Sequence, residues 1–117
     1  MLSENSHFVI EKLREIYESI LYSSIGESAG RAVLLLLRRN LKRDPFIVLW
    51  EDPIAFHKAL EKVLGVGARV LVRLLVNVLT ESGLTINSDY FLELINRGAV
   101  EEIRSYLMKI ADSHGKK

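Results

Sequence analysis

Five basic side chains gather in the stretch that ends at residue 43, and they are the first candidates for a binding site. They are Arg31, Arg38, Arg39, Lys42 and Arg43. From Ser24 to Arg43 a single acidic residue accompanies them, which leaves a local excess of four positive charges. Such a patch can neutralise phosphates and support weak, salt-sensitive binding of nucleic acid. We favour a structural role, because cations at the C-terminal end of a helix complement its dipole and no aromatic residues alternate with them for stacking on single strands.

Arg69 and Arg73 form a second candidate site, since they stand four residues apart in the otherwise apolar segment 66–81. Arginines on an apolar surface cannot be buried without carboxylate or carbonyl partners. We expect them to pair with acids of a neighbouring helix, such as Glu27 or Glu61, or with a second subunit. The alternative is that they line a pocket for an anionic ligand.

No set of catalytic or metal-binding side chains stands out. The three histidines are His7, His57 and His114. His57 precedes Glu61 by four residues, which we interpret as a solvent-facing pair and not as a zinc site. The segment Gly65-Val66-Gly67 lacks the Gly-Lys-Ser/Thr sequence of a P-loop, so its glycines are read as a helix stop and a close-packing position. We predict a protein that is not an enzyme and that holds no cofactor or metal.

The composition is that of an ordinary globular domain. The chain has 117 residues, of which 49% are hydrophobic and 26% charged, with a net charge of +1 and no cysteine. This size predicts one helical domain over residues 1–117, with a frayed tail at 113–117. Residues 1–10 do not resemble a secretory signal, and the longest uncharged apolar run, 32–37, is far shorter than the roughly 20 residues needed to cross a bilayer. We therefore expect a soluble protein, and the lack of cysteine fits the cytoplasm.

Capping signals and apolar periodicity predict six helices. They cover residues 8–23, 24–40, 53–64, 66–81, 88–96 and 99–112. Ser24 and Glu27 have the spacing of a capping box for the second helix. Asp52 and Pro53 have the types expected at the N-cap and first position of the third helix, which Gly65 ends.

Residues 41–51 form the one long connection in this scheme. Pro45 cannot continue a helix, and the apolar run from Phe46 to Trp50 is of β type. We interpret it as an extended segment tucked over the core, in preference to a short strand pairing between subunits. Trp50 is either an exposed interface anchor or a plug beneath the loop.

The helix over 66–81 is apolar almost all round, apart from a stripe that includes Arg69, Arg73 and Asn77. Such a helix lies at the centre of a core or at a subunit interface. Small residues early in the second helix permit close approach of another helix; they include Gly26, Ala29 and Gly30. We predict an all-α, compact bundle of five to six helices around a central apolar helix, and a homodimer whose contact involves one of these two helices.

Three segments carry a resemblance to a known family. They are Ser24-Ile25-Gly26-Glu27-Ser28, Asp52-Pro53-x-x-Phe56-x-x-x-Leu60 and Leu64-Gly65-x-Gly67-Ala68. The part of the chain around them, about residues 17–84, resembles the Nitrosopumilus output domain family of small archaeal helical proteins. Members occur as free-standing domains or at the end of signalling proteins, and the family offers no catalytic residues to transfer. The resemblance implies an archaeal interaction or signalling output module whose ligand is unknown.

The sequence thus suggests three candidate functions. The leading one is a non-enzymatic protein-interaction or adaptor domain, and the second is nucleic-acid binding through the cluster at 38–43. The third is binding of a small anionic or apolar ligand between helices near Arg69 and Arg73.

Overall fold

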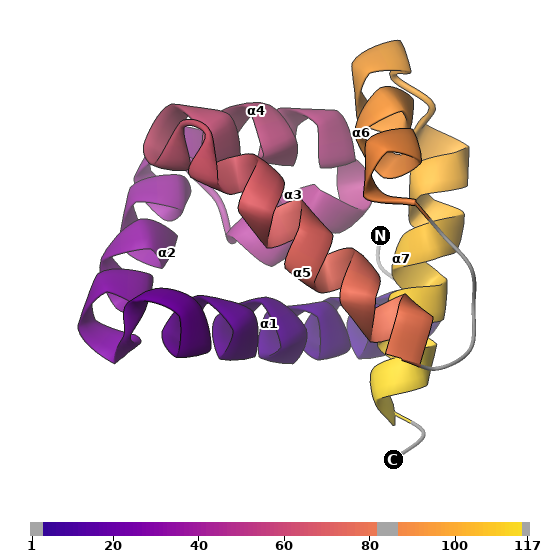
Figure 1. Ribbon diagram of the computed structural model, residues 1–117, viewed down its shortest axis with the longest axis horizontal. Coiled ribbons are helices and arrows are strands. Elements are labelled where there is room, and N and C mark those ends of the chain that lie inside the picture. The colour runs from indigo at the N-terminus through magenta and orange to yellow at the C-terminus, as the bar shows by residue number, and fades with distance from the viewer. Residues whose placement is uncertain (1–3, 82–86, 116–117) are drawn as a thin grey trace.

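The computed structural model describes residues 4–81 and 87–115, and every regular element in them is a helix. The helices are α1 Glu4–Ile25, α2 Glu27–Leu41, α3 Pro45–Glu51, α4 Pro53–Leu64, α5 Gly67–Glu81, α6 Ser88–Arg97 and α7 Val100–Gly115. Figure 1 shows α1 along one side, with α2 rising from its end, α4 opposite, and α5 crossing diagonally toward α7. The prediction of an all-α bundle is confirmed. None of the described helices is both long enough and apolar enough to cross a membrane.

Three aromatic rings from different helices meet at the centre of the core. Tyr17 of α1 packs edge-on against Phe46 of α3 and Phe56 of α4, with ring centres 5.8 and 5.5 Å apart. All three residues are buried. Edge-to-face contact is the preferred geometry of aromatic pairs, so these rings fix α1, α3 and α4 relative to one another.

The helix α3 corrects the prediction of an extended segment at 41–51. Asp44 accepts a hydrogen bond from the backbone N–H of Phe46 at 2.9 Å, and Pro45 occupies the first turn. Val48 and Leu49, which follow in the same helix, are buried in the core. The β-type composition was misleading because helix propensity is a weak preference that burial overrides. The pair Asp44-Pro45 repeats the helix-start signal of Asp52-Pro53, and it could have revealed α3.

The junction between α1 and α2 also differs from the prediction. Ser24 belongs to α1, which runs on to Ile25, and α2 begins at Glu27. Gly26 takes the N-cap position with φ of 90° and without a side-chain cap. The capping box is therefore wrong, because a positive φ that glycine tolerates makes the break instead.

The signals around α4 are confirmed. Asp52 accepts a hydrogen bond from the N–H of Ala55 at 3.1 Å, and Pro53 begins the helix. Gly65 follows Leu64 with φ of 59°. Local side-chain and backbone chemistry thus sets both ends of α4.

The helix α5 packs against α1, α4, α6 and α7. Over residues 67–77, where side-chain burial is described, its buried residues are Ala68, Leu71, Val72, Leu75 and Val76. The other side of the helix is exposed and carries Arg69, Val70, Arg73 and Asn77. One side of α5 therefore faces solvent in the single chain.

Candidate functional site

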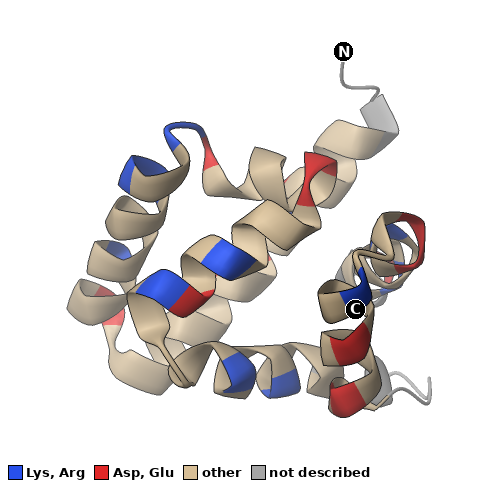
Figure 2. Ribbon diagram, turned by 90° about the horizontal axis from the view of Figure 1, so that it is seen from above, with Lys and Arg blue, Asp and Glu red and all other residues tan. Residues whose placement is uncertain are grey.

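Four residues of the basic cluster lie at the end of α2 and in the loop that follows it, at one edge of the molecule (Figure 2); they are Arg38, Arg39, Lys42 and Arg43. Arg31 lies in the first half of α2. All five side chains are exposed. Two of them form ion pairs: Arg31 with Glu27 at 2.6 Å, and Arg43 with Glu51 at 2.8 Å. Within the described part of the chain, Arg38, Arg39 and Lys42 have no acidic partner within 4 Å.

The side of α2 turned away from the core is partly apolar, and we call it the outer face of α2. It consists of the exposed residues Ser28, Ala29, Ala32, Leu35, Leu36 and Arg39. Leu35 and Leu36 are 51% and 47% exposed. Spacings of three, four and seven residues place this set opposite the buried Gly30, Val33 and Leu37. Two large leucines beside two alanines thus remain uncovered in the single chain.

The small residues of α2 serve different purposes. Gly30 is buried against α1, where an added Cβ would lie 2.5 Å from Cδ1 of Tyr22. Gly26 makes the break between the helices. Of the three candidate interface positions, only Ala29 lies on the outer face of α2.

Trp50, the fourth interface candidate, lies on α3 and is half-buried against the core. The guanidinium carbon of Arg104 lies 5.6 Å from the centre of its ring. Cation–π contacts of this kind occur within about 6 Å of the ring centre. Much of the Trp50 side chain is thus in contact with other residues of the same chain.

The helices α4, α5 and α6 pack against one another (Figure 1). A small cavity opens between them. It has a volume of about 50 Å³, and its polar lining residues are His57, Glu61, Arg69 and Asn96. Apolar side chains of α5 and α6, among them Val72 and Ile95, complete its wall. We call this space the α4–α5–α6 cavity.

His57 corrects the prediction of a solvent-facing pair, because its side chain is buried with 3% exposure. Its Nδ1 lies 2.8 Å from the carbonyl oxygen of Pro53. A carbonyl only accepts, so Nδ1 carries the proton and Nε2 is left as an acceptor. Burial lowers the pKa of His57 to about 4, although the Pro53 carbonyl opposes that shift. The ring is therefore neutral at pH 7.

Nε2 of His57 is covered and has no hydrogen-bond partner among the described residues. A buried acceptor without a donor costs roughly 1–3 kcal/mol. Native proteins usually satisfy such atoms with protein groups or ordered water. The His57 side chain also lines the adjoining cavity, although Nε2 itself is covered.

Arg69 and Glu61 line the same cavity from α5 and α4, and both are exposed. Neither arginine of α5 forms an ion pair with Glu27 or Glu61 within 4 Å, and Glu27 instead binds Arg31. Arg73 is exposed one turn further along α5 and is not part of the lining. The structure thus brings Arg69 together with His57, Glu61 and Asn96, and leaves Arg73 apart.

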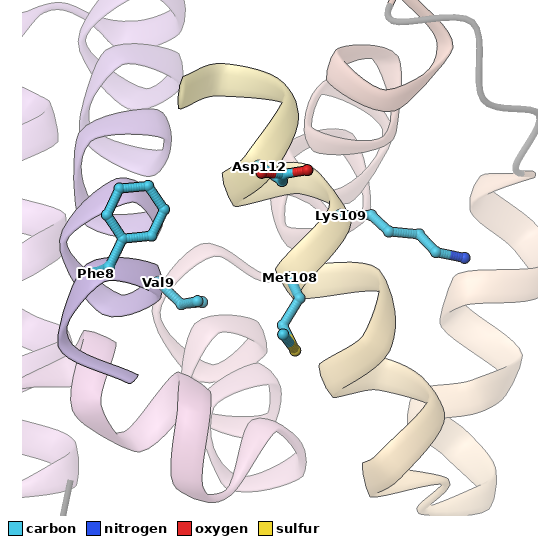
Figure 3. A pocket seen from close by; sticks show the side chains of 5 residues that line it. All are labelled: Phe8, Val9, Met108, Lys109 and Asp112. Carbon is cyan, nitrogen blue, oxygen red and sulfur yellow. The ribbon is translucent and has the colours of Figure 1, made fainter. Parts of the chain in front are cut away.

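A larger groove of about 440 Å³ is lined by residues from the start of α1 and from the second half of α7. Phe8, Val9 and Met108 face its interior, whereas the Lys109 side chain points away from Phe8 (Figure 3). Its lining is mainly apolar, and nothing in it selects an occupant.

No group of three histidine or carboxylate side chains able to hold a metal ion occurs among the described residues. No family model, no curated protein and no solved structure matches this chain.

Proposed function

We propose that the protein is a non-enzymatic interaction module that acts as a homodimer, with the outer face of α2 as the contact between subunits. The observation that carries the proposal is the pair of exposed leucines, Leu35 and Leu36, on a helix whose opposite side is already buried. Covering apolar surface is the main driving force of association. The resemblance to an archaeal signalling output family fits such a role, and the lack of cysteine fits a cytoplasmic protein.

A second copy is the occupant that this face fits best. In an antiparallel, two-fold arrangement, Ala32 can lie against Leu35 of the partner subunit, so that a small side chain meets a large one. The acidic residue of α2 lies in its first turn and the arginines in its last turn. Antiparallel pairing therefore brings the first turn of one α2 toward the last turn of the other, with opposite helix dipoles side by side.

The dimer is tested by sedimentation equilibrium over a concentration series. A 15-residue helix offers less than the roughly 800 Å² per partner of a standard interface. We therefore expect two-chain mass at high concentration and dissociation on dilution. Leu36→Glu should give one-chain mass at every concentration with unchanged helical circular dichroism.

Met108→Glu is the matched control, because Met108 is similarly exposed but lies on α7. It should leave the dimer intact. A one-chain mass of the natural protein up to about 1 mM would contradict the proposal. Loss of the dimer in Val70→Glu, with Leu36→Glu unaffected, would move the contact to the open side of α5 and overturn the assignment to α2.

Nucleic-acid binding is the second candidate, and it is supported by Arg38, Arg39 and Lys42 gathering at one edge without described acidic partners. We expect an electrophoretic shift of nucleic acid that weakens steeply with salt and is lost in Arg38→Glu/Arg39→Glu. Arg97→Glu on α6 is the control. Absence of any shift at low salt would exclude this function.

A further inference from the structure

We propose that the α4–α5–α6 cavity binds a small carboxylate that carries a hydrogen-bond donor next to its carboxyl group. This chemistry is shared by small amino acids and small 2-hydroxy acids. The cavity lies on helices other than α2, so this proposal stands independently of the homodimer.

The charges on the wall set the polarity of the ligand. Arg69 of α5 and Glu61 of α4 line one cavity without forming an ion pair within 4 Å of each other. Arginine presents a planar fork of donors that matches a carboxylate, and Glu61 accepts hydrogen bonds from an ammonium or hydroxyl group. A ligand with a carboxylate at one end and a donor at the other bridges the two residues.

Asn96 and His57 complete the recognition. Asn96 of α6 offers both a donor and an acceptor. The ring of His57 forms part of the buried wall, and its Nε2 lacks a donor in the described structure. A ligand in the cavity therefore lies beside the His57 side chain, although Nε2 itself is covered.

The size of the cavity limits the ligand. A water molecule needs roughly 10–15 Å³ of such cavity volume, and the cavity offers about 50 Å³. It therefore accommodates a ligand of a few non-hydrogen atoms, such as glycine or glycolate. Nucleotides and sugars are too large to enter.

The histidine ring provides a direct readout in the full chain. The protein has three histidines, so their ring ¹⁵N and ¹³C signals can be assigned and followed by NMR during titration. We expect saturable shifts of the His57 signals with glycine or glycolate, with binding on the order of millimolar. Acetate lacks the donor and methylammonium lacks the carboxylate. Each should therefore bind more weakly than glycine or glycolate by about tenfold or more. Comparison of glycine with glycolate identifies the class of donor.

The binding test uses substitutions of exposed residues, because these should leave the fold intact. Arg69→Gln should weaken binding of both probes by about tenfold or more. Glu61→Gln should weaken glycine more than glycolate, because it removes the negative charge that faces the ammonium group. Arg73→Gln is the matched control, since Arg73 is exposed on the same helix outside the cavity.

Two results would overturn the proposal. The first is the absence of any saturable His57 shift up to about 100 mM glycine and glycolate. The second is an effect of Arg73→Gln as large as that of Arg69→Gln, which would show a diffuse attraction of anions to α5.

Discussion

Arg104 of α7 binds the C-terminal end of α3, where its Nε donates a hydrogen bond to the carbonyl oxygen of Trp50 at 2.8 Å. The same guanidinium donates to the carbonyl oxygen of Glu51, also at 2.8 Å. Carbonyls at a helix end lack partners within the helix, and a cation there complements the dipole. One side chain thus joins helices from opposite halves of the chain.

We expect Arg104→Met to lower the free energy of unfolding by about 2 kcal/mol, because hydrogen bonds to charged groups contribute roughly 1.5–3 kcal/mol. Urea unfolding followed by circular dichroism measures the change. Arg97→Met is the control, since Arg97 is exposed and its ion pair with Glu102 is 4.0 Å long; it should alter stability little. Equal effects of the two substitutions would show that Arg104 acts only as a surface charge.

Asp44 should make the protein sensitive to acid. Burial raises the pKa of Asp44, but hydrogen bonds from Arg14 and from the N–H of Phe46 outweigh it, and the pKa is lowered. A folded pKa below the unfolded value gives stability above about pH 4 that is lost as the pH falls through the folded pKa. Asp44→Asn keeps an N-cap acceptor and removes the charge that binds Arg14 at 2.7 Å.

We therefore expect Asp44→Asn to destabilise the protein at pH 7 by about 1 kcal/mol, with the difference disappearing as the pH falls through the lowered pKa of folded Asp44. Denaturant unfolding at several pH values tests this. A difference that persists unchanged at low pH would assign the effect to packing and not to the ion pair.

His57 should make the stability of the fold depend on pH over a higher range than Asp44 does. Its pKa falls from 6.5 to about 4 on folding because burial disfavours the charged ring. The unfolded chain therefore takes up the proton more readily, and stability that is complete above about pH 6.5 decreases as the pH falls toward 4. The shift corresponds to a loss of about 3 kcal/mol over this range. His57→Gln should lack this component, and parallel stability curves for the two proteins between pH 7 and 5 would contradict it.

Gly30 and Tyr22 should behave as a coupled pair. A Cβ at Gly30 would meet the Tyr22 ring at 2.5 Å, so Gly30→Ala should destabilise the natural protein even though alanine favours helices by about 1 kcal/mol. In a Tyr22→Ala background the clash is absent, and the same substitution should stabilise. A double-mutant cycle by thermal or urea unfolding measures the coupling. The same sign in both backgrounds would show that the ring moves aside freely.

The sequence was most informative where a helix boundary depends on adjacent residues. Asp52 with Pro53 and the glycines at 65 and 98 mark helix ends in the structure. The same reasoning missed α3, because the β-type residues after Pro45 outweighed the repeated Asp-Pro signal. It misplaced the start of α2, because Ser24 stays helical when Gly26 provides the break.

The candidate site was only partly within reach of the sequence. Periodicity singled out Arg69 and Arg73 as a pair, and packing separated them by placing Arg69 beside a cavity and Arg73 outside it. The burial of His57 and the position of Asn96 in the same cavity lining depend on how α4, α5 and α6 pack together. No local sequence pattern encodes the packing of these three helices.

The sequence by itself determined an all-helical chain with most of its caps and breaks, because backbone hydrogen bonds and φ preferences act over a few residues. The tertiary structure alone decided which polar groups became buried, which arginine gained neighbours and which leucines stayed exposed. These outcomes depend on contacts between helices far apart in the chain, where burial outweighs local preference.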